Sequence, residues 1–139
     1  MNWLFWSLLA ALFAGLTAIF AKLGLANIGS NLATAIRTSV VLILVWAIAA
    51  ATREVVAIGT ITKRNWVFLI LSGLATGLSW LCYFRALQLG EASRVAPIDK
   101  LSVVFVLVFA GLFLHEPITW RSACGAGLIV GGGLLLALK

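Results

Sequence analysis

Charged side chains are scarce in this 139-residue sequence, which has 4 Asp and Glu and 10 Lys and Arg residues. They make up 10% of the chain, and hydrophobic residues make up 63%. A soluble globular domain carries about 25% charged residues, so this composition excludes an ordinary soluble domain. The apolar runs are continuous and do not alternate with polar residues. They therefore predict membrane-spanning helices and exclude the strands of a membrane barrel.

Other absences exclude further classes. The two cysteines, Cys82 and Cys124, lie inside apolar runs, which excludes a disulfide framework. Lys and Arg are scattered singly along the chain, so no nucleic-acid partner is expected. His115-Glu116-Pro117 resembles the start of a zinc motif, but Thr119 stands where the second histidine belongs. No GxSxG motif and no paired catalytic carboxylates are present. We therefore expect no enzyme activity, no bound metal and no cofactor.

Five apolar segments predict an all-α integral membrane protein with five transmembrane helices. Turn-forming or polar residues separate the segments, and the longest polar stretch, 52–65, predicts a loop with a short surface helix. The N-terminus lacks the basic start of a signal peptide, so the first segment is expected to be retained. The expected helices span about residues 3–21, 32–51, 66–86, 95–114 and 120–138, forming one module over 1–139.

The fourth segment is expected to draw charge into the membrane. From Leu101 to Leu114 all 14 residues are apolar except Ser102, and a helix of that length reaches about 21 Å across a core of about 30 Å. A spanning helix must therefore start near Val95, with Pro97 in its first turn, where a missing N–H is harmless. This start places Asp99 and Lys100 in the membrane or in a watery cavity, where ionisable residues mark binding sites and pathways. Asp99 is the only acidic residue expected well inside a span, so it is the candidate for proton coupling, whereas a lasting ion pair would make it a poor proton carrier.

The second segment makes a similar prediction for Arg37. The run 38–51 alone is too short to span, so Arg37 lies within the membrane or just beneath its surface. One interpretation is that Arg37 reaches toward the headgroups. The other is that it lines a cavity or pairs with a carboxylate. Since the second and fourth segments enter from the same side, Asp99 is expected at a similar depth and an Arg37–Asp99 pair is geometrically reasonable.

A polar stripe runs along the third segment. Ser72, Thr76, Ser79 and Tyr83 follow one another at spacings of four, three and four residues, so they share a narrow arc of the helix. Such a stripe should face other helices or a cavity, away from lipid. The expected solute pathway combines it with the charged residues: Thr34, Arg37, Thr76, Ser79, Trp80, Tyr83, Asp99 and Lys100.

Two GxxxG pairs predict close helix packing, including contacts between subunits. Gly73 and Gly77 form the first pair, and Gly127 and Gly131 form the second in a glycine-rich last segment. The loops also lack the charge bias that fixes orientation. With the membrane-embedded Arg37 and Lys100 left out, each side of the membrane would receive four basic residues: Lys22, Arg85, Arg94 and Lys139 on one side, and Arg53, Lys63, Arg64 and Arg121 on the other. We therefore expect insertion in both orientations and an antiparallel homodimer, whose two copies form the inverted repeat of many transporters.

The sequence also resembles a known family. The run from Tyr83 to Ile98, YFRALQLGEASRVAPI, is similar to the signature of EamA modules of the drug/metabolite transporter superfamily. So is the long apolar run ending at Glu116 followed by a glycine-rich helix from Gly125 to Leu136. Most members join two five-helix modules, and this chain resembles a single-module member. The resemblance implies transport of small metabolites through a cavity lined by two modules.

Two functions are compatible with these features. The first is a secondary transporter of small metabolites, anionic or zwitterionic solutes such as amino acids among them, which works by alternating access and couples to protons through Asp99. The alternative is a structural or accessory membrane subunit, or one half of a heterodimeric transporter. Either protein would sit in the plasma membrane, which for a bacterium is the inner membrane.

Overall fold

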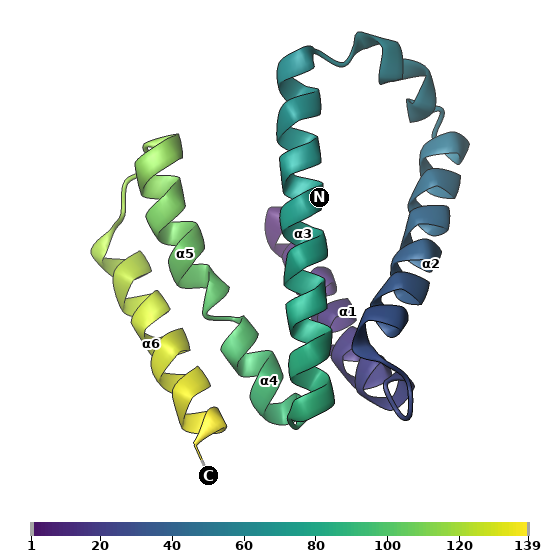
Figure 1. Ribbon diagram of the computed structural model, residues 1–139. Coiled ribbons are helices and arrows are strands. Elements are labelled where there is room, and N and C mark those ends of the chain that lie inside the picture. Colours follow the sequence, from purple (N-terminus) through teal and green to yellow (C-terminus); the bar gives the residue numbers. More distant parts are fainter. Residues whose placement is uncertain (1, 139) are drawn as a thin grey trace. The chain divides into compact units, whose positions relative to one another are not determined.

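The computed structural model describes residues 2–138, and every regular element in that part of the chain is helical (Figure 1). Five stretches are long and apolar enough to cross a bilayer, with Ala92–Leu114 counted as one. The prediction of an all-helical protein with five candidate spans is therefore confirmed. The elements are α1 (Trp3–Gly24), α2 (Ser30–Ala51), the 3₁₀ helix η1 (Glu54–Thr60), α3 (Lys63–Leu89), α4 (Ala92–Asp99), α5 (Ser102–Phe109), the π-helix η2 (Ala110–Leu114) and α6 (Trp120–Ala137).

The chain divides into two compact units. The central unit is Gly24–Gln88 and contains α2, η1 and α3. The terminal unit consists of the residues up to Leu23 and from Leu89 onward. It contains most of α1 together with α4, α5, η2 and α6.

The central unit is a pair of antiparallel helices joined through η1 (Figure 1). The Gln88 side-chain amide donates a hydrogen bond to the Ile28 carbonyl at 3.2 Å, so the end of α3 lies beside the turn that precedes α2. At the other end of α3, the Thr62 hydroxyl accepts a hydrogen bond from the Asn65 amide and caps the first turn. Buried side chains of this unit gather at the end where α2 begins and α3 ends: Leu25, Ser30, Thr34, Phe84 and Leu87.

The fourth span is not the single helix that the sequence predicted. It begins three residues before Val95, at Ala92, so Pro97 lies in the interior of α4 instead of its first turn. A proline there has no N–H to donate and its ring crowds the preceding turn. Just after the proline, the Lys100 amide donates to Pro97 O at 3.1 Å and the Leu101 amide donates to Ile98 O at 3.0 Å. These i to i+3 bonds separate α4 from α5 while keeping the backbone groups paired, as a bilayer requires.

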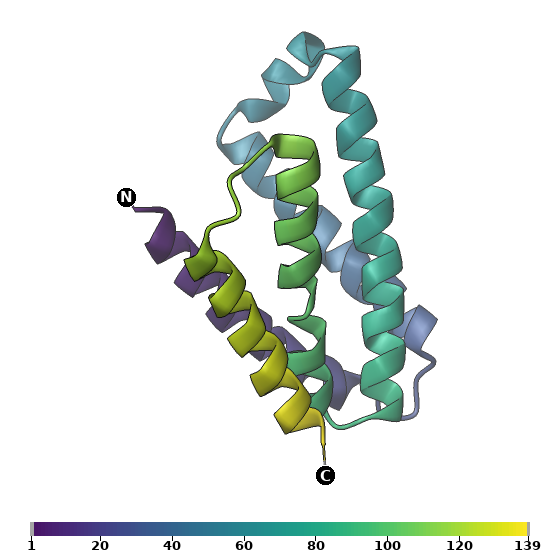
Figure 2. The same ribbon diagram turned by 90° about the vertical axis from the view of Figure 1, so that its left-hand side faces the viewer.

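The last helix packs on the first half of this broken span. In both views of the ribbon, α6 lies beside α4 (Figures 1 and 2). Gly133 is the buried residue of α6, and a Cβ added to it would lie 3.1 Å from the Pro97 carbonyl oxygen. The missing side chain therefore lets the two backbones approach closely.

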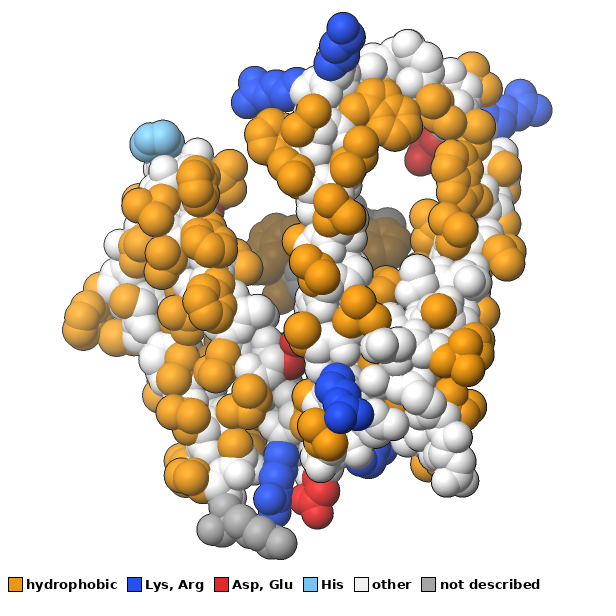
Figure 3. Space-filling model, in the orientation of Figure 1, with side chains coloured by type: hydrophobic (Ala, Val, Ile, Leu, Met, Phe, Trp, Pro, Cys, Tyr) orange, Lys and Arg blue, Asp and Glu red, His pale blue; other side chains and the backbone are white. Residues whose placement is uncertain are grey.

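Apolar side chains cover the outer surface of the helices (Figure 3). Large hydrophobic residues such as Leu12, Ile43 and Leu135 are 59%, 70% and 74% exposed. In water such a surface would drive aggregation, whereas lipid tails solvate it. The chain is an integral membrane protein.

Candidate functional site

Arg37 lies against two aromatic rings of α3. Its guanidinium carbon Cζ is 4.1 Å from the centroid of the Trp80 ring and 5.4 Å from that of Phe84. Trp80 and Phe84 are one helical turn apart, so both rings project from the same face of α3. Phe84 is only 2% exposed, and Arg37 and Trp80 are half-buried. We call Arg37, Trp80 and Phe84 the guanidinium cluster.

The backbone of Arg37 lies at a depth similar to those of its two ring partners. Arg37 follows the first residue of α2 by seven positions, which puts its backbone about 10 Å into the span. Trp80 precedes the last residue of α3 by nine positions, about 13 Å into the span from the same side, and Phe84 only about 7 Å. Cζ lies closer to the Trp80 ring, whose backbone is the deeper of the two, than to the Phe84 ring.

The two rings offset only part of the free energy that it costs to place the Arg37 guanidinium in the membrane. An Arg near the middle of a transmembrane helix costs about 2.5–3.5 kcal/mol in insertion experiments. A cation–π contact returns about 0.5–2 kcal/mol. No carboxylate in the central unit makes up the difference, because its only acidic residue is Glu54. Glu54 follows Arg37 by 17 positions, beyond the far end of α2, about 25 Å away along the helix.

The hydroxyl groups next to Arg37 are used by their own helix. The Thr34 hydroxyl, in a side chain that is 5% exposed, donates to Ser30 O at 2.8 Å. The Thr38 hydroxyl donates to Thr34 O at 2.7 Å. These bonds orient both side chains along α2 and satisfy their donors. Tyr83, half-buried on α3, interacts electrostatically with the guanidinium.

The polar stripe of α3 is open over most of its length. Ser72, Thr76 and Ser79 are exposed in the described chain, and Tyr83 is half-buried. The Thr76 hydroxyl donates to Ser72 O at 2.8 Å, which leaves its oxygen available as an acceptor. The stripe thus gives an otherwise apolar helix one face that hydrocarbon solvates poorly.

Asp99 and Lys100 lie at the break between α4 and α5. The Lys100 ammonium is 3.4 Å from the Asp99 carboxylate, and the two side chains are 56% and 39% exposed. The pair thus lies where i to i+3 bonds replace the regular α-helical pattern. The Arg37–Asp99 pair joins residues of different units and stays a prediction.

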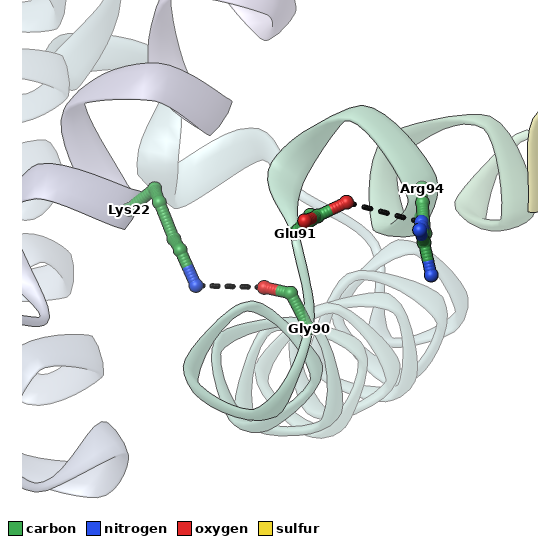
Figure 4. A network of polar contacts seen from close by, with 4 residues as sticks. All are labelled: Lys22, Gly90, Glu91 and Arg94. Atoms are coloured by element: carbon green, nitrogen blue, oxygen red, sulfur yellow. Dashed lines mark hydrogen bonds and ion pairs between the residues drawn. The ribbon is translucent and has the colours of Figure 1, made fainter. Parts of the chain in front are cut away.

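The structure contains a polar network that sequence reasoning missed (Figure 4). The Lys22 ammonium donates to the Gly90 carbonyl oxygen at 2.7 Å, just beyond the end of α3. Next to it, the Arg94 guanidinium pairs with the Glu91 carboxylate at 3.0 Å across the first turn of α4. The available signal was a lysine placed where the first apolar run ends, since such a cation favours carbonyls at helix C-termini.

The four glycines predicted to pack closely make no close contact within the described chain, and their role between subunits stays a prediction. A Cβ on any of the four GxxxG glycines would meet no atom of the described chain within 4 Å: Gly73, Gly77, Gly127 and Gly131. The glycine that makes a close backbone approach is Gly133, which the motif did not single out. Across residues 2–138, no three His, Cys, Asp or Glu side chains come together in a group that could hold a metal ion.

Comparison with known proteins places these features in a family. The EamA-like transporter family matches residues 1–138. An uncharacterized transporter in the cobO 3′ region of Sinorhizobium sp is 55% identical over 137 residues, 99% of this chain and 97% of the relative. A probable 4-amino-4-deoxy-L-arabinose-phosphoundecaprenol flippase subunit, ArnE of Aeromonas salmonicida, is 38% identical over 69 residues, 50% of this chain and 60% of its own. The uncharacterized transporter YvbV of Bacillus subtilis is 39% identical over 62 residues, 45% of this chain and 20% of its own.

No solved structure gives a significant match. The family match covers nearly the whole chain, and the five candidate spans agree with an inner-membrane transporter. The resemblance found in the run from Tyr83 to Ile98 is therefore confirmed, and the chain is a membrane transporter that belongs to the EamA-like transporter family.

Proposed function

We propose that the chain is one half of a secondary transporter that moves small polar metabolites by alternating access. The observation that carries this proposal is the open polar stripe of α3 beside the guanidinium cluster. Polar groups on a transmembrane helix face a bundle interior or a watery cavity, because lipid solvates them poorly. A second module facing the stripe would close such a cavity.

Two inverted copies of this chain are the simplest source of the second module. Four basic residues are expected on each side of the membrane, so the charge rule favours neither orientation. Gly127 and Gly131 are among the glycines whose added Cβ would meet nothing within 4 Å in the described residues, so they offer surfaces for close contact with another helix. A cavity between two inverted copies can open to either side by rocking one copy against the other.

Asp99 is the proposed site of proton coupling. It lies at the break of the fourth span, and a change of its charge would also change its attraction to Lys100 at 3.4 Å. A carboxylate held in a lasting ion pair is a poor proton carrier, so this role requires the Asp99–Lys100 contact to open during the cycle. Their exposed positions, 39% and 56%, are compatible with that requirement.

Solute flux in proteoliposomes tests the proposal. The purified chain should take up anionic or zwitterionic metabolites from a panel that includes amino acids, and an imposed pH gradient should drive the uptake. Asp99→Asn should remove the response to the gradient, while Glu91→Gln, at the exposed start of α4, should leave it intact. Absence of flux for every solute in the panel contradicts the transporter proposal, and unchanged gradient-driven flux in Asp99→Asn removes Asp99 from the coupling role.

A second candidate is one half of a transporter built from two different chains. The word "subunit" in the name of the ArnE relatives favours it. Orientation separates the two candidates. In a chain whose native cysteines are replaced by serine, Thr60→Cys in η1 should react with an impermeant maleimide from both sides if the homodimer is antiparallel. Labelling from one side only favours two different chains.

A further inference from the structure

We propose that the guanidinium cluster binds the oxyanion of the transported molecule, a carboxylate or a phosphate, with Arg37 as the residue that contacts it. This inference rests on the proposed function and names the chemical group that the pathway recognises. It depends on three observations within the central unit: the ring contacts of Arg37, the absence of a carboxylate of this unit near it, and neighbouring hydroxyls whose protons are already donated to their own helix.

The rings fix the guanidinium without using its donors. Trp80 and Phe84 interact with Arg37 through the faces of their rings, at 4.1 and 5.4 Å from Cζ. Ring faces attract the positive charge but accept no strong N–H hydrogen bond. Five N–H donors in a planar fork match two oxygens of a carboxylate or a phosphate. A flexible side chain held in one place in this way loses less entropy when a ligand binds.

Within the central unit, no carboxylate takes the place of the ligand. The only carboxylate of this unit, Glu54, lies beyond the far end of α2. The Thr34 and Thr38 hydroxyls donate to carbonyls of α2 at 2.8 and 2.7 Å, so only their uncharged oxygens remain as acceptors. Tyr83 adds a hydroxyl on the α3 side, and it belongs to the polar stripe that continues along the proposed pathway. The charge that remains uncompensated within the central unit is positive, so the complementary ligand group is anionic.

The same unit contains a matched control. Arg64 also lies near an aromatic ring, with Cζ 5.9 Å from the centroid of Phe68. Arg64 is exposed in the first turn of α3, next to water, whereas Arg37 lies about 10 Å within its span. Removal of Arg64 therefore takes away the same charge and the same kind of contact outside the proposed site.

The test is equilibrium binding to the purified full-length chain in nonionic detergent. Glutamate and inorganic phosphate represent water-soluble oxyanions, dodecyl phosphate represents a lipid-linked one, and choline is the cationic control. Tryptophan fluorescence and the shift of the melting temperature report binding. We expect at least one oxyanion probe to bind, with affinity about tenfold to a hundredfold weaker in Arg37→Gln and unchanged in Arg64→Gln. Which probe binds distinguishes a soluble from a lipid-linked substrate.

Trp80→Phe and Arg37→Lys provide further readouts. Trp80→Phe keeps an aromatic ring, so binding measured by melting should persist while the fluorescence response falls. If Arg37→Gln does not fold, as judged by gel filtration and helicity, Arg37→Lys decides the question. A lysine keeps the charge but loses the fork. Clearly weaker oxyanion binding in Arg37→Lys supports the proposal, and unchanged affinity overturns it.

The outcomes separate this inference from the proposed function. Equal binding by wild type and Arg37→Gln overturns the oxyanion site. Transport of neutral or cationic metabolites by a chain that binds none of the oxyanion probes also overturns the site, and the transporter proposal stands. Binding that depends on Arg37, without flux of any solute in the panel, supports the site and contradicts transport. Absence of both binding and flux overturns both proposals.

Discussion

Two spans of this chain contain residues that disfavour a helix, but only one of the two spans is divided. α3 continues without interruption from Lys63 to Leu89 although it contains Gly73 and Gly77. The span Ala92–Leu114 is divided near Lys100 and changes to a π-helix at Ala110. Each glycine costs about 1 kcal/mol of helix propensity, but it keeps its N–H, and in lipid the helix remains the best way to pair it. Pro97 has no N–H, so the ladder must change around it.

The difference has a functional meaning within each unit. An unbroken helix holds Trp80 and Phe84 in fixed register against Arg37. A broken helix places Asp99 and Lys100 where the backbone can change its hydrogen-bond pattern with little loss. We infer that recognition needs the rigid span, and that movement and coupling use the divided one.

Leu78→Pro is expected to have the largest effect, because it places a proline in the continuous span α3. Leu78 is 65% exposed, so its replacement removes little packing, but a proline there deletes a ladder bond in the middle of α3. We expect the free energy of unfolding to fall by about 3 kcal/mol or more. Thermal unfolding in detergent, followed by circular dichroism, measures it. Leu78→Ala is the control, and a melting temperature for Leu78→Pro equal to that of Leu78→Ala would mean that α3 tolerates a break as easily as the fourth span does.

Gly133→Ala tests how the divided span is supported. The added methyl would lie 3.1 Å from the Pro97 carbonyl oxygen, a backbone atom that cannot rotate away. We expect a loss of about 1–3 kcal/mol, typical of overpacking, with a larger loss for Gly133→Leu. Gly132→Ala adds the same methyl to the same helix and meets nothing within 4 Å. Equal melting temperatures for the two alanine variants would show that α4 does not depend on close contact with α6.

Pro97→Ala removes the proline of the divided span and is expected to have a smaller effect on stability. Alanine restores an N–H and favours a continuous helix, so we expect the chain to become more stable. The gain should be about 1 kcal/mol, only part of the roughly 3 kcal/mol that an interior proline costs, because the backbone has already adapted. Flux should fall several-fold if movement uses the break. Flux equal to wild type with higher stability would remove the break from the transport cycle.

The sequence predicted the five apolar spans well, because span length and composition depend on the bilayer and hardly on neighbours. It also led to Arg37 through the shortness of the run beside it. It did not predict Phe84 as a ring partner, because that contact depends on the register of α2 against α3. The break after Asp99 was missed because the expected start at Val95 put Pro97 in a harmless first turn. The start at Ala92 lies in a polar stretch, where hydropathy gives no boundary.

The bond from Lys22 to the Gly90 carbonyl has a consequence for biosynthesis. It joins residues that are 68 positions apart in the chain. At about 5–20 residues per second, the ribosome needs about 3–14 s to make the partner that fastens the end of the first helix. During that interval the nascent N-terminal segment lacks this anchor.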